Sequence, residues 1–165
     1  MQRPYQVLSE PEAAALIGSA EQLRDRTLLA VMLGGGLRVS ETAALKVDEV
    51  LEDADGEMLI HVLEGKGQKS RTVPVRSDVA SLVRAYLQPT GRRLGDGGPL
   101  FLPTDRAAHS RTGKPLSPRS IAYLVATAAE AAGVVAKRIS PHSLRHTYAL
   151  RALRYTGNVM AVAKL

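Results

Sequence analysis

The sequence predicts a mainly helical α+β domain that carries a small antiparallel β-sheet. Two β-rich runs, 58–63 and 70–75, flank a glycine-bounded turn, which is typical of a hairpin. Elsewhere, capping residues precede stretches of good helix formers. Aromatic residues make up only 4% of the chain, so the core must consist largely of aliphatic side chains packed between helices. We therefore expect a single domain over residues 1–165.

Helix boundaries are predicted from capping residues and from apolar spacing. Ser9 and Glu12 have the spacing of a capping box, and Pro11 lies in the first turn. Ser117 and Pro118 open a later helix in the same way. The predicted helices cover residues 10–20, 22–33, 38–45, 78–88, 119–132 and 141–155, and a further one begins near 159.

The predicted sheet consists of the hairpin and one weaker strand. Residues 45–50 alternate weakly in hydropathy and are expected to form the additional strand. Pro74 is compatible with an edge strand because it lacks a backbone N–H group. The tip and flank of the hairpin carry Lys66, Lys69 and Arg71. Such a tip is either a solvated turn or a basic arm that reaches into nucleic acid.

Charge is distributed unevenly along the chain. Residues 1–110 carry a net charge of −2, whereas residues 111–165 carry +8 with Glu130 as their single acidic residue. A basic segment almost without acidic residues favours an anionic partner such as nucleic acid over a merely solvated surface. The chain has no cysteine and no apolar run near the roughly 20 residues of a membrane span, so we expect a cytoplasmic protein.

The predicted helix 141–155 carries a candidate catalytic group. His142, Arg145 and His146 are spaced i, i+3 and i+4, which places them on one face. A guanidinium matches phosphate oxygens, and an imidazole exchanges protons near neutral pH. The structural alternative is a capping His142, an Arg145 stem covering apolar surface, and His146 as a satisfied core histidine.

A second candidate anion site follows three consecutive glycines, 34–36. Arg38 lies at the start of a short predicted helix, where backbone N–H groups and a guanidinium can face one anion. Glu41, one turn later, is placed to hold that guanidinium. The alternative is a helix-terminating glycine cluster followed by a surface i, i+3 ion pair.

Taken together, these motifs resemble the catalytic domain of tyrosine recombinases, the phage-integrase and Xer-like family. The matching stretches occur in order: GLRVSE at 36–41, GKGQKSR at 65–71, a loop containing Pro103 before the Ser117-capped helix, and PHSLRH at 141–146. The resemblance runs from about residue 7 to residue 165. It implies the catalytic-domain fold of that family and an enzyme that cuts and rejoins DNA through a phosphotyrosine link, without metal or cofactor.

The resemblance also implies roles for individual residues. Arg38 and Arg145 would clamp the scissile phosphate, Lys66 would act as the acid toward the leaving 5′ oxygen, and His142 would assist proton transfer. The expected supporting residues are Glu41 and His146. The expected DNA contacts are Lys69, Arg71 and Arg119. Double-stranded DNA is the implied partner, with self-association on DNA, in a bacterial or phage-derived protein associated with the nucleoid.

The resemblance further implies a nucleophilic tyrosine on a helix beyond Leu165, and an N-terminal core-binding domain. We therefore expect the 165-residue chain to be a C-terminally incomplete catalytic domain, without that N-terminal domain and inactive in cleavage by itself. Tyr148 and Tyr155 are expected to be packing residues instead of nucleophiles.

Two other hypotheses remain open on the residues alone. The first is a non-catalytic or regulatory DNA-binding module with the same fold, since counterion release gives affinity without chemistry. The second is a metallohydrolase that uses His142 and His146. The helical zinc motif requires Glu directly after its first His, where this chain has Ser143, and no third ligand is evident.

Overall fold

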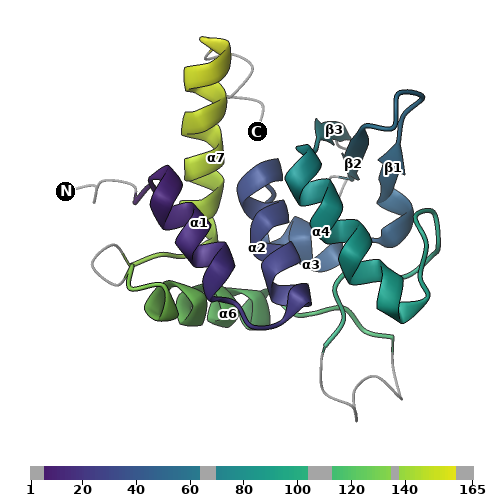
Figure 1. Ribbon diagram of the computed structural model, residues 1–165, viewed down its shortest axis with the longest axis horizontal. Coiled ribbons are helices and arrows are strands. Elements are labelled where there is room, and N and C mark those ends of the chain that lie inside the picture. Colours follow the sequence, from purple (N-terminus) through teal and green to yellow (C-terminus); the bar gives the residue numbers. More distant parts are fainter. Residues whose placement is uncertain (1–5, 64–69, 104–112, 135–137, 159–165) are drawn as a thin grey trace.

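The computed structural model describes residues 6–63, 70–103, 113–134 and 138–158. Helices dominate the fold, and a small sheet lies on the far side of the molecule from α1 and α7 (Figure 1). The helices are α1 (Glu10–Ser19), α2 (Leu23–Gly35), α3 (Val39–Ala44), α4 (Ser77–Leu87), α6 (Pro118–Ala131) and α7 (Pro141–Thr156), with 3₁₀ turns η1 (Val47–Glu49) and η2 (Gln88–Thr90). The strands are β1 (Val50–Glu52), β2 (Met58–Val62) and β3 (Arg71–Pro74). The predicted fold class is confirmed.

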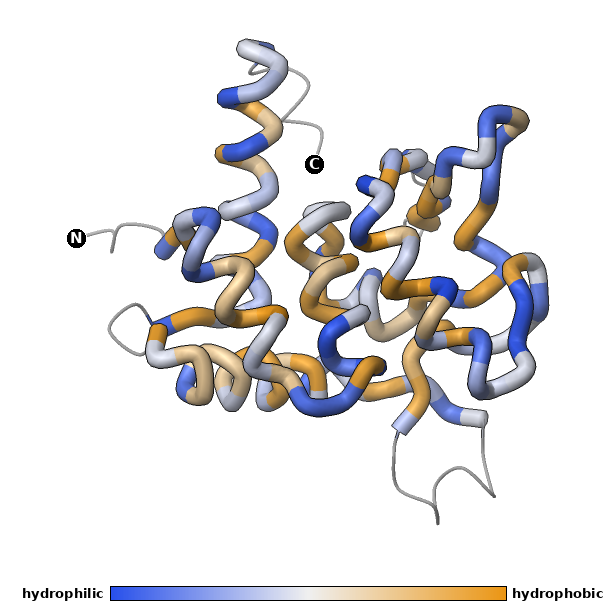
Figure 2. The backbone as a smooth tube through the Cα atoms, viewed as in Figure 1, coloured by the Kyte–Doolittle hydropathy of each residue, from blue (hydrophilic) through white to orange (hydrophobic). Residues whose placement is uncertain are grey.

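The central element is α2, which packs against α1, α4 and α7. Its residues 27–33 are all buried, so the helix is enclosed on every side. Figure 2 shows this run as a largely hydrophobic, orange segment that follows a hydrophilic first turn. The one polar side chain of this run, Thr27, donates its hydroxyl to the Leu23 carbonyl at 2.7 Å. A buried hydroxyl without such a partner would be destabilising.

Capping residues fix two of the helix starts as the sequence predicts. The Ser9 hydroxyl accepts a hydrogen bond from the Glu12 N–H at 3.3 Å, and the Glu12 carboxylate accepts one from the Ser9 N–H at 2.8 Å. The Ser117 hydroxyl accepts from the Ser120 N–H at 3.0 Å at the start of α6. These contacts satisfy N–H groups that have no partner within the helix.

The sheet is antiparallel, with strand order β1-β2-β3. Pro74 lies on β3, an edge strand, as expected. The prediction of a strand over residues 45–50 is wrong, because the chain turns through η1 and the first strand begins only at Val50. The Glu49 carboxylate accepts a hydrogen bond from the Lys46 N–H at 2.8 Å, and this local contact favours a turn over an extended strand.

The chain segment that precedes α1 is joined to the middle of α7. The Leu8 N–H donates to Thr147 Oγ1 at 3.0 Å, and the same hydroxyl donates to the Ser143 carbonyl at 2.8 Å. Thr147 is 1% exposed, so both hydrogen bonds are shielded from water. Helix α7 begins after its N-cap Ser140 and ends at Gly157, which has a left-handed conformation.

The last turns of α7 extend beyond the helices that pack around its first half (Figure 1). Tyr155 is 96% exposed there, so the prediction that it is a packing residue is wrong. Tyr148, two turns earlier, is packed against the core as expected. Across the described ranges, every helix is too short or too polar to span a lipid bilayer.

Replacing Thr147 with Val is expected to lower the free energy of unfolding by about 1–3 kcal/mol, because the buried Leu8 N–H loses its acceptor. Urea denaturation followed by circular dichroism measures the change. Thr147→Ser keeps the hydroxyl and should lose only about 1 kcal/mol, from the missing methyl group. Thr156→Val, on the exposed end of α7, should change stability by less than about 0.5 kcal/mol. Equal losses of stability in Thr147→Val and Thr147→Ser would contradict the assignment of the Thr147 hydroxyl as the acceptor for the Leu8 N–H.

Candidate active site

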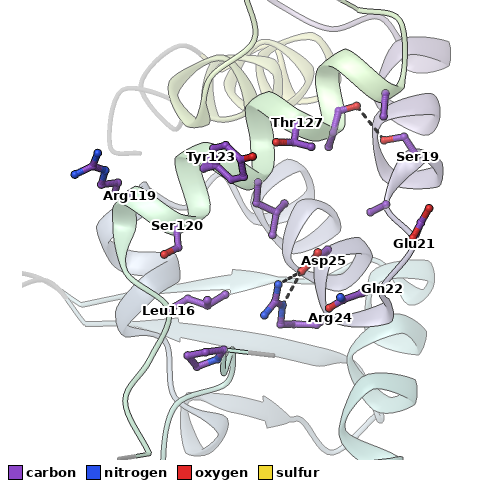
Figure 3. A pocket seen from close by; sticks show the side chains of 15 residues that line it. Ser19, Glu21, Gln22, Arg24, Asp25, Leu116, Arg119, Ser120, Tyr123 and Thr127 are labelled. Atoms are coloured by element: carbon purple, nitrogen blue, oxygen red, sulfur yellow. Dashed lines mark hydrogen bonds and ion pairs between the residues drawn. The ribbon is translucent and has the colours of Figure 1, made fainter. Parts of the chain in front are cut away.

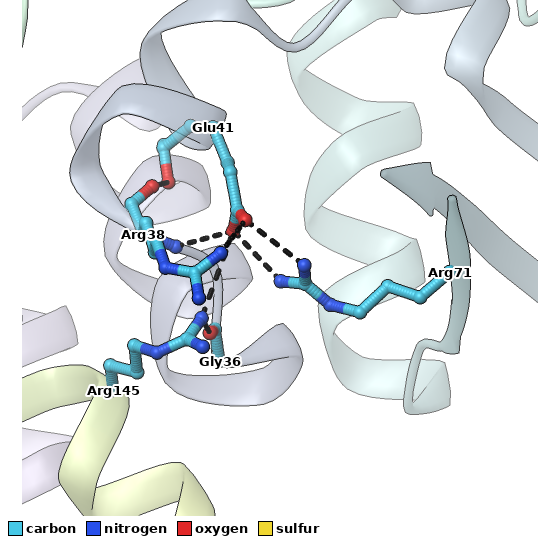
Figure 4. Close-up of polar contacts among 6 residues, drawn as sticks. Gly36, Arg38, Glu41, Arg71 and Arg145 are labelled. Atoms are coloured by element: carbon cyan, nitrogen blue, oxygen red, sulfur yellow. Dashed lines mark hydrogen bonds and ion pairs between the residues drawn. The ribbon is translucent and has the colours of Figure 1, made fainter. Parts of the chain in front are cut away.

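Three arginines from distant parts of the chain meet at one carboxylate (Figure 4). Arg38 precedes α3, Arg71 begins β3, and Arg145 lies in the second turn of α7. Glu41, on α3, lies between them. The site therefore requires α3, the hairpin and α7 to be packed together.

Glu41 holds two of the arginines through direct ion pairs. Arg71 binds it in a bidentate manner, with nitrogen–oxygen distances of 2.9 and 2.8 Å. Arg38 contacts it twice, from its guanidinium at 2.9 Å and from its backbone N–H at 2.7 Å. Arg145 is more distant, with its Nη1 atom 3.7 Å from Glu41 Oε2. The i, i+3 contact between Arg38 and Glu41 that the spacing predicts is present.

The Glu41 carboxylate remains ionised in this environment. Burial alone would raise its pKa, but the Arg71 side chain and the Arg38 N–H donate hydrogen bonds to the charged form. The positive charges of both arginines act in the same direction. Together they lower the pKa of Glu41 from 4.5 to about 2. The four side chains therefore carry three positive charges and one negative charge near neutral pH.

The arginines differ in how far they reach solvent. The side chain of Arg38 is 51% exposed, whereas those of Arg71 and Arg145 are 15% and 13% exposed. Arg145 Nη1 donates to the Gly36 carbonyl at 2.6 Å, a closer contact than its 3.7 Å approach to Glu41 Oε2. Arg38 is thus the arginine most open to a ligand, and Arg145 lies deeper and is held by backbone.

The two histidines of α7 lie beside this cluster in sequence and contact each other. Their rings meet edge to face, with centroids 4.2 Å apart, so the predicted common face is confirmed. His142 is exposed and His146 is half-buried. Burial, with the charges of His142 and Arg145, lowers the pKa of His146 below its ordinary 6.5. His146 is therefore mainly neutral at pH 7, next to an exposed imidazole.

The other predicted site residues are the expected acid, Lys66, and the three expected DNA contacts. Lys66 and Lys69 lie outside the described residues. Arg71, predicted from its place on the hairpin to contact DNA, directs both outer nitrogens to Glu41, so the structure places it within the arginine cluster. Arg119 is exposed at the start of α6. It borders a different pocket, of about 750 Å³, which the α1–α2 connection and α6 line (Figure 3).

Sequence reasoning missed two components of the site. The sharing of Glu41 between Arg38 and Arg71 joins residues 30 positions apart, and no local pattern indicates it. The Gly36 carbonyl as acceptor for Arg145 was also missed, although the glycine run itself was noticeable. Among the described residues, no cluster of three or more His, Cys, Asp or Glu side chains could hold a metal ion.

This fold is similar to that of solved recombinases. A XerA recombinase superposes with a TM-score of 0.78 at 29% identity, covering 98% of this chain and 55% of that one. A XerH recombinase bound to its difH substrate has a TM-score of 0.75 at 22% identity, covering 95% and 45%. The chain therefore has the fold of a tyrosine recombinase catalytic domain.

Sequence comparison assigns the family. The model of the phage integrase family matches residues 6–165, and the chain belongs to that family. It is 36% identical over 142 residues to a tyrosine recombinase XerC of Bradyrhizobium diazoefficiens, covering 86% of this chain and 41% of the relative. It is equally similar to a XerA of Thermococcus kodakarensis, covering 86% and 46%. The chain thus spans less than half the length of these two relatives.

Replacing Glu41 with Gln is expected to destabilise the domain by about 3 kcal/mol at pH 7, because Arg71 and Arg145 lose the charge that compensates their burial. Glu52→Gln is the matched control: its ion pair with Arg84 is about half exposed, so about 0–1 kcal/mol should be lost. Denaturant titration of both variants measures the difference. A loss no larger than that of Glu52→Gln would show that the cluster does not depend on Glu41.

Lowering the pH should remove the contribution that the Glu41 carboxylate makes to stability. The pKa of Glu41 is about 2 in the folded state and near 4.5 when unfolded, so its ionisation stabilises the fold fully above pH 4.5. This contribution is lost as the pH falls from 4.5 toward 2. We therefore expect the stability difference between wild type and Glu41→Gln to shrink over that range. A difference that stays constant from pH 6 to pH 2.5 would contradict the depressed pKa.

Proposed function

We propose that this chain forms the phosphate-activating part of a site-specific DNA recombinase that breaks and rejoins strands through a phosphotyrosine intermediate. The main support is the gathering of Arg38 and Arg145 at one carboxylate, from positions 107 residues apart, on a domain of the phage integrase family. The solved XerH relative bound to a difH substrate has the same fold and makes duplex DNA the natural ligand to test.

The charge of the cluster suits phosphoryl transfer. Negative charge spreads over the non-bridging oxygens of a phosphodiester as it reacts. Guanidiniums that are already oriented stabilise this charge without reorganising during the reaction. In the proposal, Arg38 meets one oxygen from its exposed position, and Arg145 meets the phosphate from the deeper position that Gly36 sets. Glu41 limits the repulsion between them.

In the proposed reaction, a tyrosine oxygen attacks the phosphorus and forms a phosphotyrosine bond while the bond to the 5′ oxygen breaks. The departing oxygen takes a proton, for which Lys66 is the proposed donor. His142 is exposed on α7, three residues before Arg145, and is proposed to assist proton transfer from the tyrosine. Tyr148 is a poor nucleophile in this arrangement because its ring packs against the core and burial raises its pKa.

The same basic surface would also suit a DNA-binding module that does not cut. Counterion release gives such a module affinity without chemistry. The arrangement of guanidiniums around a buried carboxylate favours an enzyme over a binding module, because non-specific attraction to DNA requires only exposed cations. Experiments on individual arginines separate the two functions.

Binding to a duplex with one nick, measured across salt concentration, tests the proposal on this chain. Arg38→Ala and Arg145→Ala should each weaken binding and reduce the slope of log affinity against log salt by about 1, because each removes one phosphate contact. The control is Arg84→Ala. Arg84 lies on α4 and forms an ion pair with Glu52, so this substitution removes the same charge away from the cluster and should leave the slope unchanged.

The outcomes separate the hypotheses. Equal effects of all three substitutions would indicate a general basic surface and count against a phosphate site at Glu41. In a form of the protein that carries the attacking tyrosine, Arg38→Ala or Arg145→Ala should reduce strand cleavage by about 10²–10³-fold. Cleavage that survives either substitution unchanged would contradict the catalytic assignment, even if DNA binding is affected.

A further inference from the structure

Arg145 and Tyr148 lie one helical turn apart on α7, and both contact Gly36 at the end of α2. The guanidinium of Arg145 donates to the Gly36 carbonyl at 2.6 Å. The ring of Tyr148 lies against the Cα atom of the same glycine. One turn of α7 therefore holds a single residue of α2 by a hydrogen bond and by a ring contact.

Gly36 is suited to this position in two independent ways. It ends α2 with a left-handed conformation, at a φ of 62°, which side chains disfavour. A Cβ atom at residue 36 would lie 2.2 Å from Cδ1 of Tyr148, and 2.8 Å from both Cε1 and Cγ. All three atoms belong to the ring. Any side chain at this position would therefore push the Tyr148 ring, and with it α7, away from α2.

The carbonyl of Gly36 holds Arg145 more closely than the carboxylate of Glu41 does. Its 2.6 Å hydrogen bond is much shorter than the 3.7 Å separation between Arg145 and Glu41. An arginine side chain has considerable rotamer freedom, so one short hydrogen bond to fixed backbone restricts it more than a long ion pair does. The direction of the carbonyl depends on the backbone conformation of Gly36, which the ring of Tyr148 contacts.

We propose that Gly36 and Tyr148 are positioning residues for Arg145: the Tyr148 ring holds the end of α2 against α7, and the Gly36 carbonyl then fixes the guanidinium near Glu41. The ring performs this role, and the hydroxyl is not required. That this placement serves phosphate binding rests on the function proposed above.

The first experiment follows Arg145 directly by NMR of the whole chain without DNA. The Nε–Hε resonance of Arg145, identified by its loss in Arg145→Lys, reports the environment of the guanidinium. Tyr148→Ala and Tyr148→Leu should shift it, and Tyr148→Phe should leave it nearly unchanged. Val83→Ala, a buried truncation on α4, is the control for general loosening and should not shift it.

The second experiment measures binding to the nicked duplex. Tyr148→Ala should weaken binding about tenfold, as expected for losing one hydrogen bond to a charged group, and Tyr148→Phe should stay within about threefold. In an Arg145→Ala background, Tyr148→Ala should have no further effect, because residues that act through one another are not additive. Gly36→Ala should also weaken binding, and adding Tyr148→Ala to it should restore part of the loss by removing the clash.

An Arg145 resonance unchanged by Tyr148→Ala and Tyr148→Leu would overturn the proposal. So would a shift of the same size in Val83→Ala, since this would indicate loosening of the whole fold. If the resonance moves as expected but Arg145→Ala binds the nicked duplex like wild type, the positioning stands and the proposed phosphate role of Arg145 fails. The two readouts thus distinguish one failure from the other.

Discussion

The ionised carboxylate of Glu41 is the interaction on which the site depends. Three guanidiniums converge near it, and two of them are more than four-fifths buried. Without a counter-charge, such groups would repel one another and lack the solvation that water provides. A single buried anion therefore allows cations from three separate elements to stay close together. It leaves them with excess positive charge, which is the condition for attracting another anion.

The three arginines differ in their partners and in their exposure. Arg71 uses both outer nitrogens on Glu41 and so stabilises the carboxylate. Arg38 shares the same carboxylate but remains half exposed. Arg145 donates to backbone, at the Gly36 carbonyl. In such a cluster, the Arg71–Glu41 pair can keep the geometry while the other two arginines meet a ligand.

Much of the fold could be predicted from local patterns, and the failures have physical causes. The Ser9 capping box and the Arg38–Glu41 spacing involve neighbouring residues, so sequence alone places them correctly. The strand expected over 45–50 failed because Glu49 satisfies the Lys46 N–H within a turn, and hydropathy alternation does not report that competition. The exposure of Tyr155 depends on how far α7 extends past its neighbours, which its own sequence does not encode. The candidate site was predictable as a set of residue types but not as a network, since the shared use of Glu41 arises only from tertiary packing.

The arginine cluster is completed late in synthesis, because Arg145 follows the other three residues by a long stretch of chain. The hydrogen bond between Arg145 and Gly36 joins residues 109 positions apart, whereas Arg71 and Glu41 are separated by only 30. During synthesis from the N-terminus, the carboxylate and its first two cations are made well before α7. A ribosome-bound chain can thus complete the Arg38–Glu41–Arg71 half of the cluster early. Arg145, the second arginine of the proposed phosphate clamp, is added only after the sheet and helices α1 to α6 have been translated, so a chain that stops before α7 cannot present both arginines.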